Sequence, residues 1–86
     1  MTKSIHTNEM IALREWLKCQ RKVQNLTMRN LAQRMARPHS FVQRVEEGDR
    51  RLDLVEYAQY CIALEIDPRT GFELVLKSIA SEHPEI

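Results

Sequence analysis

The 86-residue sequence has few of the residues that mark catalytic loops, disulfide frameworks or membrane spans. It contains only two glycines, which leaves no phosphate-binding loop, and no nucleophile–base set at a plausible spacing, so we expect no enzyme. Cys19 and Cys61 have neither metal-ligand spacing nor the density of a disulfide scaffold. We therefore expect two free thiols. Because His6, His39 and His83 are also scattered, we expect no metal site and no cofactor.

Long apolar segments are also lacking. No stretch approaches the roughly 20 apolar residues that cross a bilayer, so we expect no membrane span. Residues 1–10 lack the apolar core of a secretory signal. Together with the two free thiols, this leads us to expect a cytoplasmic protein.

The formal net charge of +1 conceals an uneven distribution of charge. Residues 18–44 contain seven basic side chains and no acidic one, whereas residues 52–86 contain two basic and seven acidic side chains. Such asymmetry is typical of a chain that presents one face to a polyanion. The alternative is an ordinary solvated surface with charges of both signs.

Hydrophobic spacing and capping residues predict five helices and no strand. The first covers about residues 8–24, the second begins at Thr27, and the third covers about residues 38–47. Asp53 opens the fourth helix with a capping-box partner at Glu56, and the pair Asp67-Pro68 opens the fifth. The predicted fold class is therefore all-α, a compact five-helix bundle in one domain over residues 1–86 with a flexible tail at about 81–86.

The same spacing predicts which side chains face inward. The expected apolar residues are Met10, Leu13 and Leu17 in the first helix, Leu31, Ala32 and Met35 in the second, Val42 and Val45 in the third, Leu54, Tyr57, Cys61 and Leu64 in the fourth, and Phe72, Val75, Leu76 and Ile79 in the fifth. Two charged residues also fall on inward faces. Arg21 follows Leu17 by one turn and Glu46 follows Val42 by one turn, so each needs a partner or a route to water.

The most informative part of the chain is residues 26–53, where two short helical patterns are joined by a tight turn. In the second pattern, opposite the two valines, lie four side chains that can hydrogen-bond base edges: His39, Ser40, Gln43 and Arg44. This arrangement predicts a helix-turn-helix with its core at about residues 27–47, in which the third helix contacts double-stranded DNA.

In these residues the chain resembles the lambda-repressor-like, or XRE, family of helix-turn-helix regulators. The resemblance covers roughly residues 13–68 and rests on LTMRNLA at 26–32, the turn at Ala36, the Glu-x-Gly ending of the third helix at 46–48, and ALEIDP at 63–68. These landmarks follow one another without a gap. The resemblance implies a small DNA-binding transcriptional regulator of bacterial or phage origin, most commonly a repressor that binds as a homodimer.

The resemblance also implies roles for individual residues. It places base contacts on His39, Ser40 and Arg44 with Gln43 adjacent, and an ion pair between Arg21 and Glu46. It places phosphate contacts at the start of the second helix, on Thr27, Met28 and Arg29. The basic residues flanking the third helix extend the expected phosphate contacts to Arg37, Arg50 and Arg51.

The chain departs from the family pattern at three positions. Met28 stands where the family often has a glutamine that contacts a phosphate, and Pro38 replaces the usual Ser or Thr cap. Ala36 replaces the turn glycine, so the turn must either avoid a positive φ or tolerate a small strain.

Several alternatives remain open from the sequence. Phe41 can pack on its own helix or contact a thymine methyl group. The apolar stripe of the fifth helix can close the core or form a dimer surface. At the level of function, the alternative to a regulator is an antitoxin-type module that masks a partner protein, with DNA binding secondary.

Overall fold

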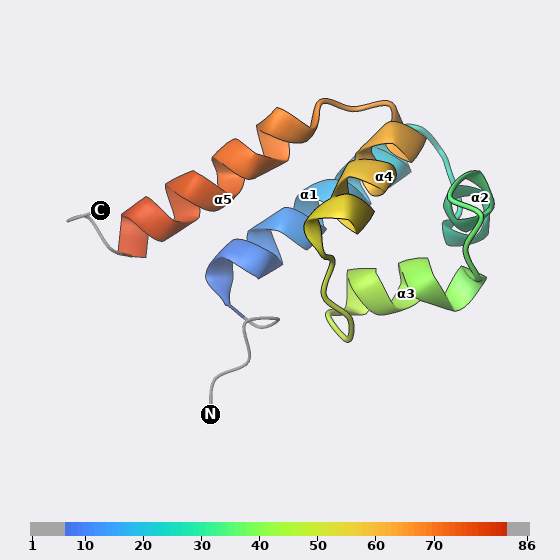
Figure 1. The fold of residues 1–86 in the computed structure, drawn as a ribbon, viewed down its shortest axis with the longest axis horizontal. Coiled ribbons are helices and arrows are strands. Elements are labelled where there is room, and N and C mark those ends of the chain that lie inside the picture. Colours follow the sequence, from blue (N-terminus) through green and yellow to red (C-terminus); the bar gives the residue numbers. More distant parts are fainter. Residues whose placement is uncertain (1–6, 83–86) are drawn as a thin grey trace.

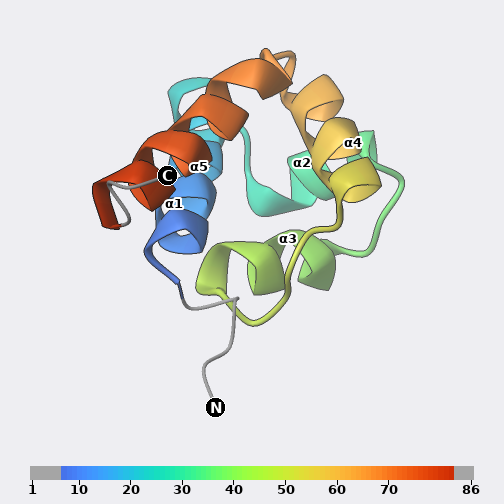
Figure 2. The same cartoon turned by 60° about the vertical axis from the view of Figure 1, so that its left-hand side comes forward.

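Residues 7–82 are the part of the chain that this computed structural model describes, and they form five α-helices and no strand. The helices are α1 (Asn8–Val23), α2 (Met28–Arg34), α3 (His39–Glu47), α4 (Leu54–Leu64) and α5 (Pro68–Glu82). The predicted all-α, five-helix class is therefore confirmed. In Figures 1 and 2, α5 lies along α1, and α3 runs along the opposite edge of the molecule with no other labelled helix beyond it.

Three helices, α1, α2 and α4, begin at a side-chain cap, and Thr27 and Asp53 begin the helices that the sequence predicted from them. The Thr7 hydroxyl accepts from Met10 N at 3.3 Å at the start of α1. Thr27 caps α2 in a reciprocal box with Asn30. Asp53 and Glu56 form the predicted capping box of α4. Each of these bonds satisfies backbone N–H groups that the first helical turn leaves without an intrahelical acceptor.

Pro38 differs from the prediction. It is the N-cap of α3 in extended geometry, with φ −62° and ψ 150°, and His39 is the first helical residue. Since a proline side chain carries no hydrogen-bonding group, α3 begins, within the described residues, without a side-chain cap.

Four helices end with a residue at positive φ: Asn25, Ala36, Gly48 and Glu65. At Ala36, φ is 55°, the amide of Ala36 donates to Gln33 O, and the amide of Arg37 donates to Ala32 O. This is the paired hydrogen-bond pattern of a helix that closes through a left-handed residue. The turn before α3 thus has the left-handed geometry that glycine usually provides. The Cβ of Ala36 makes this conformation slightly strained.

The core lies between α1, α2, α3 and α4. Its fully buried side chains include Leu17, Leu31, Val42, Tyr60 and Leu64. The predicted fourth-helix stripe was wrong at one position, because Leu54 is 80% exposed while Tyr60 is fully buried. Leu54 is the first residue of α4, and at this N-terminal end of the helix its side chain is not covered by other elements.

α5 packs on α1, its Val75 and Ile79 are half-buried, and Gly71 allows the close approach. A Cβ at Gly71 would lie 2.2 Å from Tyr57 Oη and 2.6 Å from Trp16 Cζ3. The Tyr57 hydroxyl donates to Pro68 O at 2.5 Å across the same junction. The other two residues of the predicted stripe, Phe72 and Leu76, are 58% and 49% exposed, so the stripe only partly closes the core.

Candidate nucleic-acid interface

The helix α3 has two sharply different sides. Successive residues of an α-helix are rotated by about 100°, so His39, Ser40, Gln43 and Arg44 fall within an arc of about 140°. All four are exposed. The opposite side carries Phe41, Val42, Val45 and Glu46, and all four are buried.

The buried side of α3 is fixed to α1 by the ion pair of Arg21 and Glu46. Arg21 Nε lies 2.6 Å from Glu46 Oε2, and Arg21 Nη2 lies 3.0 Å from Glu46 Oε1. The two side chains are 9% and 2% exposed. The hydrogen bond to Glu46 raises the pKa of Arg21. A fork of two charge-assisted bonds fixes the orientation as well as the distance, so α3 is held both in position and in rotation about its axis.

Arg21 also connects the ion pair to the start of the helix-turn-helix. Its Nη1 donates to Leu26 O at 2.7 Å, immediately before the capping residue of α2. The Tyr60 hydroxyl is buried beside this pair and has no hydrogen-bond partner among residues 7–82. Burial raises the pKa of Tyr60, and the nearby charge of Glu46 adds to the effect.

Glu47 was not singled out from the sequence, although it shares the exposed side of α3. Its Oε2 accepts from Gln43 Nε2 at 3.2 Å, so it touches one of the predicted base-contacting side chains. The signal was present in the spacing, because Glu47 follows Gln43 by four residues and therefore lies one turn further along the same face.

The predicted phosphate contacts at the start of α2 have different environments. Thr27 and Arg29 are exposed, and the Thr27 hydroxyl accepts from Asn30 N at 2.9 Å. Met28 is half-buried and packs against the core. Its thioether has no N–H or O–H to offer a phosphate, so Met28 has a packing role in this structure.

The basic residues flanking α3 are organised by one carboxylate. Arg50 donates to Glu56 through Nη1 at 2.8 Å and Nη2 at 2.7 Å, and Arg37 Nη2 donates to the same carboxylate at 3.2 Å. Their guanidinium carbons lie 4.8 Å and 4.6 Å from the centre of the Phe41 ring. Arg51 is exposed, and its carbonyl oxygen accepts a hydrogen bond from Arg50 Nη1 at 2.9 Å.

Phe41 is therefore a core residue. It is 5% exposed, its ring lies 6.2 Å from that of Tyr60, and the two arginines cover it. Of the two sequence alternatives, the structure favours packing. The partners include residues of α4 and the flanking loops, which the sequence could not identify.

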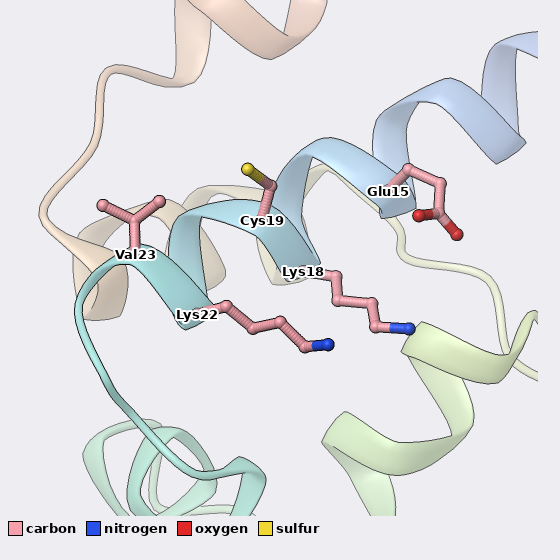
Figure 3. Close-up of a pocket in the computed structure, with 5 residues that line it drawn as sticks. All are labelled: Glu15, Lys18, Cys19, Lys22 and Val23. Carbon is pink, nitrogen blue, oxygen red and sulfur yellow. The ribbon is translucent and has the colours of Figure 1, made fainter.

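A shallow hollow on the outer side of α1 is lined by Glu15, Lys18, Cys19, Lys22 and Val23 (Figure 3). Lys18 and Lys22 extend from one side of the helix, while Cys19 and Val23 point to the other. All five side chains come from one helix, so the hollow is a strip of the surface of α1 that carries two lysines. Cys19 is exposed and Cys61 is buried in the core, and both are free thiols.

The described residues form neither a metal-ligand cluster nor a membrane-spanning helix. Residues 7–82 contain no group of three His, Cys, Asp or Glu side chains placed to hold a metal ion. None of the helices in this range is both long and apolar enough to cross a membrane.

Comparison with known proteins gave matches among solved structures. An XRE-family-like protein from Pseudomonas syringae pv. tomato superposes with a TM-score of 0.78 at 32% identity, covering 86% of this chain and 90% of the other. The restriction-modification controller protein C.AhdI from Aeromonas hydrophila superposes with a TM-score of 0.70 at 28% identity, covering 76% and 98%.

A third structure is that of the restriction-modification controller protein C.Esp1396I, solved as a tetramer in complex with its natural 35-base-pair operator. It superposes with a TM-score of 0.74 at 19% identity, covering 86% of this chain and 97% of the other, and this likeness concerns the fold. No protein-family model matches the sequence, and no curated protein does. The identity and mutual coverage with the Pseudomonas protein, together with the capped α2, the turn at Ala36 and the Arg21–Glu46 pair, show that this chain belongs to the XRE family of helix-turn-helix regulators.

Proposed function

We propose that this protein is a sequence-specific transcriptional regulator that binds double-stranded DNA by inserting α3 into the major groove. The observation that carries the proposal is the exposed side of α3, where four hydrogen-bonding side chains lie together on a helix anchored by a buried ion pair. A major groove admits an α-helix, and base edges there present distinct donor and acceptor patterns. Repression is the simplest mode, because a bound protein of this kind occludes the DNA it covers.

Each exposed side chain of α3 suits a particular partner. Arg44 has a guanidinium fork that matches O6 and N7 of guanine, and Gln43 can bond N6 and N7 of adenine. Ser40 and His39, nearer the start of the helix, carry a hydroxyl and an imidazole that can bond either base edges or phosphates. Glu47 holds the Gln43 amide at 3.2 Å in the free protein, so Gln43 must exchange that bond for a base or share it.

The residues proposed from the sequence to contact phosphates belong to the start of α2 and to the segments before and after α3 in the chain. Thr27 and Arg29 stand at the exposed start of α2, and Arg37, Arg50 and Arg51 flank α3. Phosphate contacts set the register and orientation of a protein on the duplex, while the base contacts carry the sequence information. For Met28, only the backbone is chemically suited to this task.

We infer that the protein binds as a homodimer through the apolar surface of α4 and α5. This surface includes Leu54, Val55 and Ile62, which are 80%, 65% and 75% exposed, and Phe72 and Leu76 of α5. Large apolar side chains gathered on two neighbouring helices are typical of an interaction surface. A two-fold dimer would present two copies of α3 to half-sites one helical turn apart. Operator DNA of a bacterium or phage lies in the cytoplasm, so such a regulator would act there.

Selection of bound duplexes from a random pool tests the proposal. We expect a two-fold symmetric consensus, and we expect sedimentation to give twice the mass of one chain at the concentrations that bind. Binding without enrichment of any sequence would contradict sequence-specific regulation. A tight complex with an unrelated protein that abolishes DNA binding, with no enrichment by the free chain, would instead favour the antitoxin-type function.

A further inference from the structure

The group formed by Arg37, Phe41, Arg50 and Glu56 joins four parts of the fold. Arg37 lies in the turn before α3, Phe41 in α3, Arg50 in the loop after α3, and Glu56 in the first turn of α4. Glu56 is 8% exposed and Phe41 is 5% exposed, whereas the side chains of Arg37 and Arg50 are 33% and 35% exposed. The acidic and aromatic members thus lie beneath, and the two cations form the outer layer.

Two cations over one ring require a counter-charge. The guanidinium carbons of Arg37 and Arg50 lie within 4.6 Å and 4.8 Å of the same ring centre, so without an anion they would repel each other. Glu56 supplies that anion, with bonds of 2.7 Å and 2.8 Å to Arg50 and 3.2 Å to Arg37. The bonds from Arg50 and from the Asp53 amide lower the pKa of Glu56 to about 2, so the carboxylate is charged at neutral pH.

The arginines retain hydrogen-bonding capacity after binding Glu56. Among the described residues, the side chain of Arg37 donates one hydrogen bond, to Glu56, and the side chain of Arg50 donates to Glu56 and to Arg51 O. A guanidinium carries more N–H donors than either residue uses. The cluster has a net charge of +1 and N–H donors that Glu56 does not engage, which suits an oxyanion.

We propose that Glu56 is a positioning residue that holds Arg37 and Arg50 over Phe41 as one preorganised unit for a DNA phosphate beside α3. This inference rests on the proposed function, and it assigns a DNA-binding role to an acidic residue that itself touches no DNA. Ordering the two long side chains before binding removes part of the entropy that association would otherwise cost.

Glu56→Gln tests the proposal while keeping the helix cap, because a glutamine oxygen can still accept from the Asp53 amide at this position of a capping box. Asp53→Asn is the matched charge control. It removes one negative charge three residues away, asparagine remains a good N-cap, and the carboxylate of Glu56 is left with both arginines. Circular dichroism would establish that every variant is folded at the assay temperature.

Affinity for a duplex selected by the parent protein should be measured across a series of salt concentrations. We expect Glu56→Gln to bind about tenfold more weakly and to reduce the salt slope by about one unit, as for the loss of one phosphate contact. Asp53→Asn should bind at least as tightly as the parent. Glu56→Asp keeps the charge but shortens the side chain, so it should weaken binding as Glu56→Gln does.

A mutant cycle tests whether Glu56 acts through an arginine. Arg50→Ala should weaken binding clearly in the parent and much less in the Glu56→Gln background, because the arginine is no longer held in place. The inference is overturned if Glu56→Gln matches Asp53→Asn, or if Glu56→Asp binds like the parent. If the parent protein selects no sequence at all, the proposed function fails instead.

Discussion

Replacing one partner of the Arg21–Glu46 ion pair should lower the free energy of unfolding far more than replacing both partners. Arg21→Met would leave the carboxylate of Glu46, 2% exposed, without its two bonds of 2.6 Å and 3.0 Å. An unpaired buried charge of this kind destabilises by about 3–5 kcal/mol. A small domain has about 5–15 kcal/mol in all, so the variant would be close to unfolding.

The double variant Arg21→Met/Glu46→Leu has a smaller expected cost. It removes both charges and fills the space with apolar groups of similar size, a change that is often near neutral. One loss remains, because Leu26 O no longer receives its 2.7 Å bond from Arg21. That bond is worth about 1 kcal/mol or somewhat more, since the donor is charged. The double variant should therefore lose about 1–2 kcal/mol, with a coupling energy of at least about 2 kcal/mol between the two sites.

Urea unfolding followed by circular dichroism measures these differences for the parent, both single variants and the double variant. Single and double changes that cost equally little would refute the argument. Such a result would mean that the pair is hydrated in solution and that α3 is held on α1 by apolar packing alone.

Three further predictions concern stability. Gly71→Ala should lower stability by about 1–3 kcal/mol, because the new Cβ would lie 2.2 Å from Tyr57 Oη and 2.6 Å from Trp16 Cζ3, whereas Thr70→Ala at the exposed neighbouring position should be nearly neutral in the same thermal melt. Ala36→Gly should raise stability by up to about 1 kcal/mol in urea unfolding, because glycine relieves the strain at φ 55°, and an unchanged or lower value would contradict strain at this turn. The pKa of Glu56 is lowered from 4.5 to about 2, so its contribution to stability is complete above about pH 4.5 and is lost as the pH falls towards 2. Glu56→Gln should therefore reduce the dependence of stability on pH in that window, and parallel curves for parent and variant would argue against the pairing with Arg50.

The local features of the fold were predictable because they depend on residues close in sequence. A threonine or aspartate before an apolar pattern identifies the start of a helix, and Thr7, Thr27 and Asp53 all act as caps. The inward position of Arg21 and Glu46 also followed from spacing. Their partnership came from the family resemblance, since spacing within one helix cannot identify a partner on another.

Features that depend on where neighbouring helices end were not predictable. Periodicity placed Leu54 on an inward stripe, but its position at the end of α4 leaves it exposed, while Tyr60 fills the core. The conformation of Ala36 was also open, because an alanine tolerates a left-handed turn only when the surrounding helices enforce it.

In the candidate site, too, local features were predictable and contacts between distant residues were not. The four exposed side chains of α3 could be identified from the apolar residues opposite them, so one helix contained the whole signal. The convergence of Arg37 and Arg50 on Glu56 joins residues up to 19 positions apart in sequence, and a list of basic residues gave no sign of it. Basic composition therefore indicated a polyanion-binding face without indicating which arginines act together.

The most direct test of the central claim, that α3 contacts bases, is a parallel selection of bound DNA by the parent, Arg44→Ala and the control Arg69→Ala. Arg69 is an arginine of α5 whose side chain is 87% exposed, so its loss changes the charge by the same amount away from α3. We expect the Arg69→Ala consensus to match that of the parent, and the Arg44→Ala consensus to lose about 1–3 kcal/mol of discrimination at one base pair of each half-site. An Arg44→Ala consensus identical to that of the parent at every position, with all sites bound more weakly by one factor, would mean that Arg44 contacts only phosphate and would contradict the assignment of base contacts.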